Sequence, residues 1–418
     1  MMKSVAYSKI EGKIKAPSSK SMMQRAIAAS LLAKGQSKIF YPSFCEDSQA
    51  SMRVAQALGA KIQNAEGMVI VEGGFAPVRG ELDCGEAGLC IRMFAPIAAL
   101  FSKEIKMVGH GSLLKRPLDM IEKPLQELGA ICQSNHGYLP LQIQGPLKGG
   151  KAIVDGSVSS QFLTGLLVAL PTLERDTELT VLNLKSKPYI DMTLQVLEDF
   201  GIQIHHSDYE RFFIQGNQKY KAHDCYIEGD WSGAAFMLVA AAIAGKACID
   251  NLIFDSRQAD RKILDVLQAV GAYTAIQNDS ITIAKKNLKS FVLDATECPD
   301  LFPPLVALAA HCNGVSRIAG LSRLEHKESN RGMILQKEFA KIGIKIGLEE
   351  DTMLVYGGTV CSGKINSHHD HRIAMAGAIA ALNSTGKIEI ENAEAVAKSY
   401  GDFFQDLSSL GAEVTLLA

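Results

Sequence analysis

Seven basic side chains are spread along the sequence in contexts that favour anion binding. They are Lys20, Arg25, Arg116, Lys327, Arg331, Arg372 and Lys398. Any one of them alone is most simply a solvated surface charge. However, Lys327 and Arg331 are four residues apart and share a helix face, with Glu328 between them, and Ser21 and Arg25 have the same spacing. Like charges gather only where anions intervene, so the set implies a ligand with more than one phosphate or carboxylate.

Hydroxyl and carboxyl groups supply the rest of the candidate chemistry. The serine-rich run Gly156–Gln161 has the make-up of a helix start that binds phosphate. It is not a nucleotide-binding loop, because no Gly-Lys-Ser/Thr follows. Asp300 precedes an apolar helix, where a helix cap and a general base fit equally well. Glu328 lies between two cations, which favours ion pairing unless substrate geometry supports proton transfer.

Cofactor chemistry has no motif in this sequence. His368, His369 and His371 are close together, but no second cluster with zinc-like spacing accompanies them, so we expect no metal. No Gly-x-Gly-x-x-Gly follows a strand pattern, which leaves dinucleotide binding unsupported. The nine cysteines include no Cys-x-x-Cys pair and are expected to be free thiols.

Composition excludes several classes of protein. The 418 residues are 47% hydrophobic and carry a formal charge of −2, so neither disorder nor binding to a nucleic acid is indicated. The first residues have no apolar run typical of a signal peptide. The uncharged stretch Trp231–Gly245 is shorter than the roughly 20 residues of a membrane-spanning helix. We expect a soluble, cytoplasmic monomer that acts on small molecules.

A hydrophobic-Gly-hydrophobic step recurs six times at intervals of 68–72 residues. The glycines are Gly59, Gly129, Gly201, Gly271, Gly343 and Gly411. A helical pattern precedes the glycine, as in Ser48–Leu58, and alternating apolar residues follow it, as in Ala60–Val71. The period predicts six units of helix, C-terminal glycine and strand–turn–strand.

Six Ala/Leu-rich segments with the same period predict helices that are apolar on every face and therefore buried. They are Ser21–Ala33, Gly88–Leu100, Ser160–Leu170, Gly233–Ala244, Leu301–His311 and Arg372–Leu382. Lys20 and Arg372 stand at helix starts, where the dipole disfavours a cation unless an anion is present. We expect two clusters of three units, with charged helix starts facing a shared cleft and a boundary near Gly216–Ile227.

Motifs from one end of the chain to the other support a family assignment. They are Pro17–Arg25, Arg116–Pro117, Gly156–Thr164, Ser186–Asp191, Glu228–Asp230, Lys327–Arg331, Asp370–Arg372 and Lys398–Asp402. In this order they resemble the 5-enolpyruvylshikimate-3-phosphate (EPSP) synthase family of enolpyruvyl transferases. The resemblance implies an α/β fold, a two-domain inverse α/β barrel with three βαβαββ repeats and buried helices in each domain. It places residues 14–227 in an N-terminal lobe and residues 1–13 with 228–418 in a C-terminal lobe, with crossovers near Lys13 and Ile227.

The resemblance also implies a reaction of the shikimate pathway, which leads to chorismate and the aromatic amino acids. The enolpyruvyl group of phosphoenolpyruvate would pass to the 5-hydroxyl of shikimate 3-phosphate, releasing phosphate without a metal or organic cofactor. Shikimate 3-phosphate would contact Lys20, Ser21, Arg25, Ser159, Ser160, Gln161, Ser186, Asp300 and Lys327. Phosphoenolpyruvate would contact Lys20, Gly88, Arg116, Gln161, Arg331, Arg372 and Lys398. Asp300 would be the base at the attacking hydroxyl, Glu328 would transfer the methylene proton, and Lys20 would complete the catalytic set.

The chain departs from the family pattern at two places. Glu86-Ala87-Gly88-Leu89 replaces the usual Asn-Ala-Gly-Thr, and Arg323 stands where many members have Asn. A carboxylate beside anionic substrates is unexpected, so we expect Glu86 to turn away and pair with a neighbouring cation.

Two alternatives remain open from the sequence. The related transferase that acts on a UDP-amino sugar shares the fold, but it typically has Lys-Asn near its start and often a Cys before its Arg-Pro. Here Ser21 follows Lys20, and no cysteine lies between Cys90 and Cys132. A non-catalytic anion-binding homologue is the other alternative, which the pair Asp300 and Glu328 disfavours because binding alone needs no proton transfer.

Overall fold

The chain divides into two compact units. The computed structural model describes residues 1–74 and 76–417. One unit, here the N-terminal unit, is Ser18–Ile227; the other, the C-terminal unit, joins Met1–Pro17 to the residues from Glu228 onward. The first crossing therefore follows Pro17, four residues later than the Lys13 that the resemblance implied, because residues 10–15 form a strand of the C-terminal unit.

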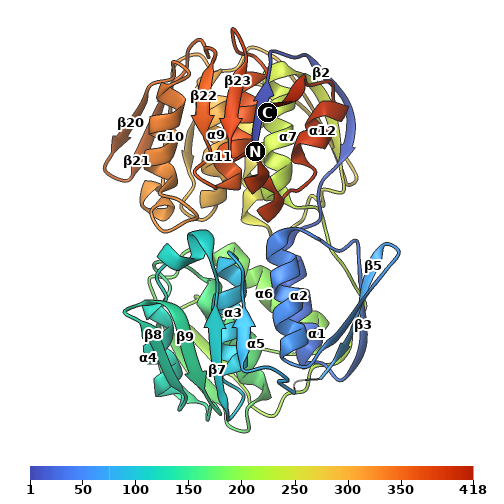
Figure 1. The fold of residues 1–418 in the computed structure, drawn as a ribbon, viewed down its shortest axis with the longest axis vertical. Coiled ribbons are helices and arrows are strands. Elements are labelled where there is room, and N and C mark those ends of the chain that lie inside the picture. Colours follow the sequence, from blue (N-terminus) through green and yellow to red (C-terminus); the bar gives the residue numbers. More distant parts are fainter. Residues whose placement is uncertain (75, 418) are drawn as a thin grey trace. The chain divides into compact units, whose positions relative to one another are not determined.

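The described residues of the N-terminal unit, 18–74 and 76–227, form three four-stranded sheets and six α-helices; Figure 1 labels several of them. Its strands are β3 (Gly35–Phe40), β4 (Lys61–Ala65), β5 (Met68–Gly73) and β14 (Cys225–Tyr226); β6 (Glu81–Asp83), β7 (Glu104–Val108), β8 (Ile131–Asn135) and β9 (Tyr138–Gln144); and β10 (Gly150–Asp155), β11 (Thr177–Leu182), β12 (His205–Ser207) and β13 (Arg211–Ile214). Its helices are α1 (Lys20–Leu32), α2 (Glu46–Ala57), α3 (Gly88–Ala98), α4 (Asp119–Glu127), α5 (Gln161–Ala169) and α6 (Lys187–Asp199).

The C-terminal unit has the same composition of elements. Its strands are β2 (Ile10–Lys15), β15 (Gly245–Asp250), β16 (Tyr273–Gln277) and β17 (Ser280–Ala284); β18 (Val292–Asp294), β19 (Val315–Ala319), β20 (Ile346–Glu349) and β21 (Thr352–Tyr356); and β1 (Met2–Val5), β22 (Gly363–Asn366), β23 (Ile388–Glu391) and β24 (Val414–Leu417). Its helices are α7 (Trp231–Ala244), α8 (Ile263–Ala269), α9 (Phe302–Ala310), α10 (Arg331–Ala340), α11 (His371–Ala381) and α12 (Phe403–Ser409).

Each sheet repeats one topology. In the order β6-β7-β9-β8, the first pair is parallel and the other two pairs are antiparallel, with Glu81 opposite Lys106 and Ile105 opposite Ile143. The parallel pair is joined through α3, and α4 follows β7, so the unit reads βαβαββ. A parallel pair needs such a helical crossover, whereas a hairpin can join the antiparallel pair. The six-fold repeat predicted from the glycine spacing is confirmed.

Two strands are exchanged across the units. β2 directly precedes α1 of the N-terminal unit, yet it pairs in parallel with β15. β14 directly precedes α7 of the C-terminal unit, yet it pairs in parallel with β3. The N-terminal strand β1 pairs with β23 and β24 and so completes the last repeat; in Figure 1 this blue segment lies among the red strands.

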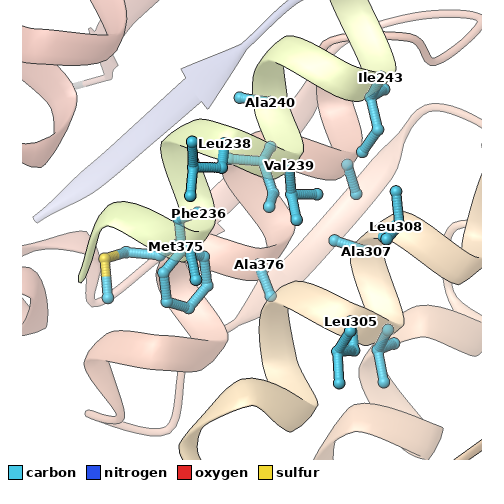
Figure 2. Packing of buried hydrophobic residues seen from close by; sticks show 14 of the residues in the cluster. Phe236, Leu238, Val239, Ala240, Ile243, Leu305, Ala307, Leu308, Met375 and Ala376 are labelled. Atoms are coloured by element: carbon cyan, nitrogen blue, oxygen red, sulfur yellow. The ribbon is translucent and has the colours of Figure 1, made fainter. Parts of the chain in front are cut away.

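The six predicted apolar helices form the cores. α7 is the clearest case, because all of its residues are buried. Figure 2 shows side chains of α7, α9 and α11 meeting in one cluster, with Phe236 of α7 and Ala376 of α11 among them. A helix that is apolar on every face is stable in water only when other elements surround it. Among residues 1–74 and 76–417, no helix combines the length and apolarity needed to cross a membrane.

The repeated glycines end the outer helices. All six have positive φ, between 81° and 116°. At Gly59 the amide bonds to the carbonyl of Gln56, and the next amide bonds to that of Ala55, which closes the end of α2. The left-handed conformation required here strains any residue with a Cβ, so glycine is the natural choice. The predicted C-terminal glycines are confirmed.

Candidate active site

Charged side chains of the C-terminal unit gather around Asp300. This residue lies in a short 3-10 turn, Pro299–Leu301, directly before α9. Its Oδ1 is 3.1 Å from Lys327 Nζ and 2.8 Å from Arg331 Nη1, and its Oδ2 is 3.2 Å from Arg372 Nη2. Three cations that lie 27 to 72 residues away in the sequence thus converge on one carboxylate.

Arg331 connects this carboxylate to two others. It is the first residue of α10 and is 1% exposed. Its Nε and Nη2 donate to the two oxygens of Asp370 at 2.8 and 3.2 Å, and Nη2 also lies 2.5 Å from Glu328 Oε2. Asp370 in turn caps α11 by accepting the amide of Arg372. The bidentate pair therefore fixes the start of α10 against the start of α11.

We call these six side chains the Asp300 cluster. They are Asp300, Lys327, Glu328, Arg331, Asp370 and Arg372. Burial by itself would raise the pKa of Asp300, but Arg372, Lys327 and Arg331 hold it well below its usual value. Burial lowers the pKa of Lys327 despite the nearby Asp300. With three cations and three carboxylates the cluster is formally neutral, which favours the burial of Arg331, Asp370 and Arg372 within it.

Lys398 contacts the segment that leads into α11. It ends the 3-10 segment Ala393–Lys398, is buried, and donates from Nζ to the carbonyl of His369 at 2.8 Å. His368 instead bonds through Nε2 to Glu338 Oε1 at 3.0 Å. Within the described part of the chain, no three His, Cys, Asp or Glu side chains are grouped as a metal site.

Lys20 of the N-terminal unit has an acidic partner. It is the first residue of α1, where Ser19 is the cap, and its Nζ lies 2.8 Å from Oδ2 of Asp47 in the first turn of α2. A cation at a helix start was expected to need a nearby anion, and Asp47 is such an anion. Nothing in the sequence pointed to Asp47, since acidic residues in a first helical turn are common.

Arg25 donates its hydrogen bonds within the protein. Only 2% of its surface is exposed. Its guanidinium donates to the hydroxyl of Thr193 at 2.9 Å and to the carbonyls of Ser21 and Tyr189 at 2.8 and 3.1 Å. Burial lowers the pKa of Arg25 to about 10, still well above neutral pH. In this structure Arg25 ties α1 to α6, whereas the resemblance implies a contact with shikimate 3-phosphate.

Arg116 packs directly against the start of α3. Its guanidinium occupies the space in which a Cβ at Gly88 would lie, so Gly88 permits this approach. Arg92, a buried arginine of α3, donates to the carbonyl of Pro117 and to Oε1 of Gln161, both at 2.9 Å. Arg92 thus holds Gln161 near the Arg116 segment. Arg92 was not among the predicted site residues, although a cation inside an otherwise apolar helix was a usable signal.

The serines of the N-terminal unit lie on two adjacent loops. Ser159 accepts the amide of Gln161 through its hydroxyl at 3.2 Å, at the start of α5. Ser186 occupies the N-cap position of α6 with φ of 59°. Gly156 joins the two loops, because its carbonyl accepts the amide of Lys185. Ser160 is buried beside them. The loops therefore present hydroxyl groups at two neighbouring helix starts, an arrangement suited to an anion.

The residues that depart from the family pattern lie in defined surroundings, and the expected pairing of Glu86 with a cation stays a prediction. Leu89 is a buried core residue of α3. Glu86 accepts hydrogen bonds from the amide and the hydroxyl of Ser112, both at 2.7 Å. Burial lowers the pKa of Arg323, which lies near Glu297 and Asp300.

Comparisons with known proteins identify the family of this chain. The family model of EPSP synthase (3-phosphoshikimate 1-carboxyvinyltransferase) matches residues 5–407. The 3-phosphoshikimate 1-carboxyvinyltransferase of Clostridium beijerinckii is 38% identical over 96% of both chains, and that of Clostridium kluyveri is 37% identical over 98% of this chain and 97% of its own. An EPSP synthase structure from Acinetobacter baumannii superposes with a TM-score of 0.83 at 27% identity, covering 99% of this chain and 100% of that one. The enolpyruvyl transferase NikO from Streptomyces tendae, at 16% identity over 99% and 98% of the two chains, shares the fold with a TM-score of 0.80. These matches span nearly the whole chain, and the chain belongs to the EPSP synthase family.

Proposed function

We propose that this protein transfers the enolpyruvyl group of phosphoenolpyruvate to the 5-hydroxyl of shikimate 3-phosphate and releases phosphate. The observation that carries the proposal is the Asp300 cluster, in which three cations contact Asp300 and one of them, the buried Arg331, also contacts Glu328; these two carboxylates are suited to proton transfer. Relatives named 3-phosphoshikimate 1-carboxyvinyltransferase over nearly the whole chain support the same reaction. The protein is thus an enolpyruvyl transferase of the shikimate pathway.

The reaction requires an acid and a base. The 5-hydroxyl oxygen bonds to C2 of phosphoenolpyruvate while its proton leaves and C3 gains a proton, which forms a tetrahedral intermediate. The C2–O bond to phosphate then breaks and C3 returns a proton, which restores the double bond. Asp300 is assigned as the acceptor of the hydroxyl proton, and Glu328 as the group that gives and removes the proton at C3.

The cations of the cluster can serve both binding and acid–base chemistry. Without substrate, Lys327, Arg331 and Arg372 hold the pKa of Asp300 low, so the carboxylate is ionised but a weak base. Both substrates carry a phosphate and a carboxylate, which compete for these cations. When the cations turn toward substrate, the pKa of Asp300 rises because its burial is no longer offset, and its basicity increases.

The remaining site residues are assigned by their place in the family motifs. We assign shikimate 3-phosphate to Lys20, Ser21, Arg25, Ser159, Ser160, Gln161, Ser186, Asp300 and Lys327. We assign phosphoenolpyruvate to Lys20, Gly88, Arg116, Gln161, Arg331, Arg372 and Lys398. The hydroxyl-bearing loops at the starts of α5 and α6 support the first assignment. The contact of Arg116 with Gly88 supports the second.

A phosphate-release assay with purified protein tests the proposal. We expect release with phosphoenolpyruvate plus shikimate 3-phosphate and none when a UDP-amino sugar replaces the shikimate compound. Arg116→Ala should reduce turnover at least ~100-fold, about 2.7 kcal/mol of transition-state stabilisation. Phosphate release from phosphoenolpyruvate with the UDP-amino sugar, but not with shikimate 3-phosphate, would overturn the proposal. We further propose a cytoplasmic monomer, and gel filtration at several concentrations tests the oligomeric state.

A further inference from the structure

Glu86 makes a contact that the proposed reaction does not use. It lies two residues before α3, and its Oε2 accepts both the amide and the hydroxyl of Ser112 at 2.7 Å. Ser112 is the second residue of the 3-10 turn Gly111–Lys115. A carboxylate holds two converging donors more strongly than a neutral acceptor does. The positive end of α3 also favours a negative charge at this position.

The turn is shaped to receive this carboxylate. Gly111 has φ of 57°, and a Cβ built there would overlap the carboxylate of Glu86. The preceding residue, His110, donates its amide to the carbonyl of Gly85 at 2.9 Å. The segment before α3 and the turn are therefore joined by backbone and side-chain bonds on both sides of Gly111.

The same turn leads directly to Arg116. Arg116 is the residue after the turn, and its amide bonds to the carbonyl of Leu113 at 3.2 Å. On its other side, Arg92 holds the carbonyl of Pro117 at 2.9 Å. The Arg116 guanidinium also packs on Gly88. Two contacts therefore join the start of α3 to the turn and the residue after it: Glu86 with Ser112, and Gly88 with Arg116.

We propose that Glu86 is a positioning residue, which fixes the Gly111–Lys115 turn and thereby holds Arg116 in its place over Gly88. The inference rests on the proposed role of Arg116 in binding phosphoenolpyruvate. An arginine side chain is long and flexible, so a firmly held backbone limits the conformations it must give up on binding.

Steady-state kinetics of four variants separate the hydrogen bonds from the charge. Glu86→Ala should raise the KM for phosphoenolpyruvate about tenfold or more, with the KM for shikimate 3-phosphate within about twofold. Glu86→Gln keeps the acceptor and should stay within about threefold of wild type, and Ser112→Ala should lie between them. Glu81→Ala is the matched control, because Glu81 pairs with Lys106 on the exposed surface, and it should leave both constants unchanged.

A double-variant cycle tests whether Glu86 acts through Arg116. In an Arg116→Ala background, adding Glu86→Ala should change phosphoenolpyruvate kinetics by less than about twofold. A full additional loss there, a Glu86→Gln variant as impaired as Glu86→Ala, or an unchanged KM in Glu86→Ala would each overturn the inference. The thermal unfolding midpoint of every variant shows whether a change in KM arises merely because the variant is unfolded. Wild type that releases no phosphate from the two substrates would contradict the proposed function. That result differs from a failure of the inference about Glu86, in which wild type is active.

Discussion

Replacing Arg331 with alanine tests the electrostatic account of the Asp300 cluster. The cluster is formally neutral, and without Arg331 it holds two cations and three carboxylates, a charge of −1. Arg331 is 1% exposed, so water cannot take its place without rearrangement. Removing one partner of a buried ion pair typically costs 3–5 kcal/mol, and we expect Arg331→Ala to lower the free energy of unfolding by about that amount at pH 7.

Acid should reduce this loss of stability. In wild type, Arg331 is one of three cations that hold the pKa of Asp300 well below its usual value, against the effect of burial. Without Arg331, the folded-state pKa of Asp300 rises, so the folded variant binds a proton more readily than before. A carboxyl whose folded pKa is raised gains stability as the pH falls through that pKa. The difference between variant and wild type should therefore become smaller as the pH falls through the raised pKa of Asp300 in the variant.

Urea unfolding followed by circular dichroism measures both effects. Arg317→Ala is a matched control, because Arg317 lies exposed on β19 of the same unit and should change the free energy of unfolding by less than about 0.5 kcal/mol. Either of two results would refute the electrostatic account: a loss under about 1 kcal/mol for Arg331→Ala at pH 7, or a loss that grows in acid.

Three further changes probe other parts of the structure. Gly88→Ala should raise the KM for phosphoenolpyruvate about tenfold, because the new Cβ would displace the Arg116 guanidinium; an unchanged KM would contradict that placement. Arg25→Met should lower the free energy of unfolding by about 3 kcal/mol in urea titrations, because methionine cannot make the hydrogen bonds by which the buried guanidinium joins α1 to α6; a neutral result would exclude the bracing role. Burial and the nearby Asp300 raise the pKa of Asp260 to about 6. The free energy of unfolding of wild type should therefore rise by about 1–2 kcal/mol relative to that of Asp260→Asn as the pH falls from 7 to 5. A fall in this difference over the same range would contradict the raised pKa.

The sequence predicted the structure well where a feature depends on the residues of a single helix or turn. The glycines at the helix ends were predictable because only glycine adopts positive φ without strain, and all six do so. The buried helices were predictable because a segment such as Trp231–Ala244 has no polar face to offer water. Both inferences depend on residues within one or two helical turns.

Signals for the site were weaker where a side chain's partner lies far away in the sequence. The sequence marked Lys20 and Arg25 alike as candidate ligands of an anion. The structure gives Lys20 a carboxylate partner, Asp47, and gives Arg25 carbonyl and hydroxyl partners on α6. Arg92 was missed because its partners, Pro117 and Gln161, are 25 and 69 residues away. A charge in isolation does not reveal which groups will surround it.

The chain by itself determined the repeat, its six helix ends, its buried helices and the residue types available for anion chemistry. Only the tertiary structure decided that β2 and β14 exchange places and that Lys327, Arg331 and Arg372 meet at one carboxylate. The physical reason is that parallel strand pairing and ion pairing depend on how elements pack. Strands with nearly the same local sequence pattern, such as β2 and β14, could therefore pair in either unit, and the packing of the complete fold determines in which one they pair.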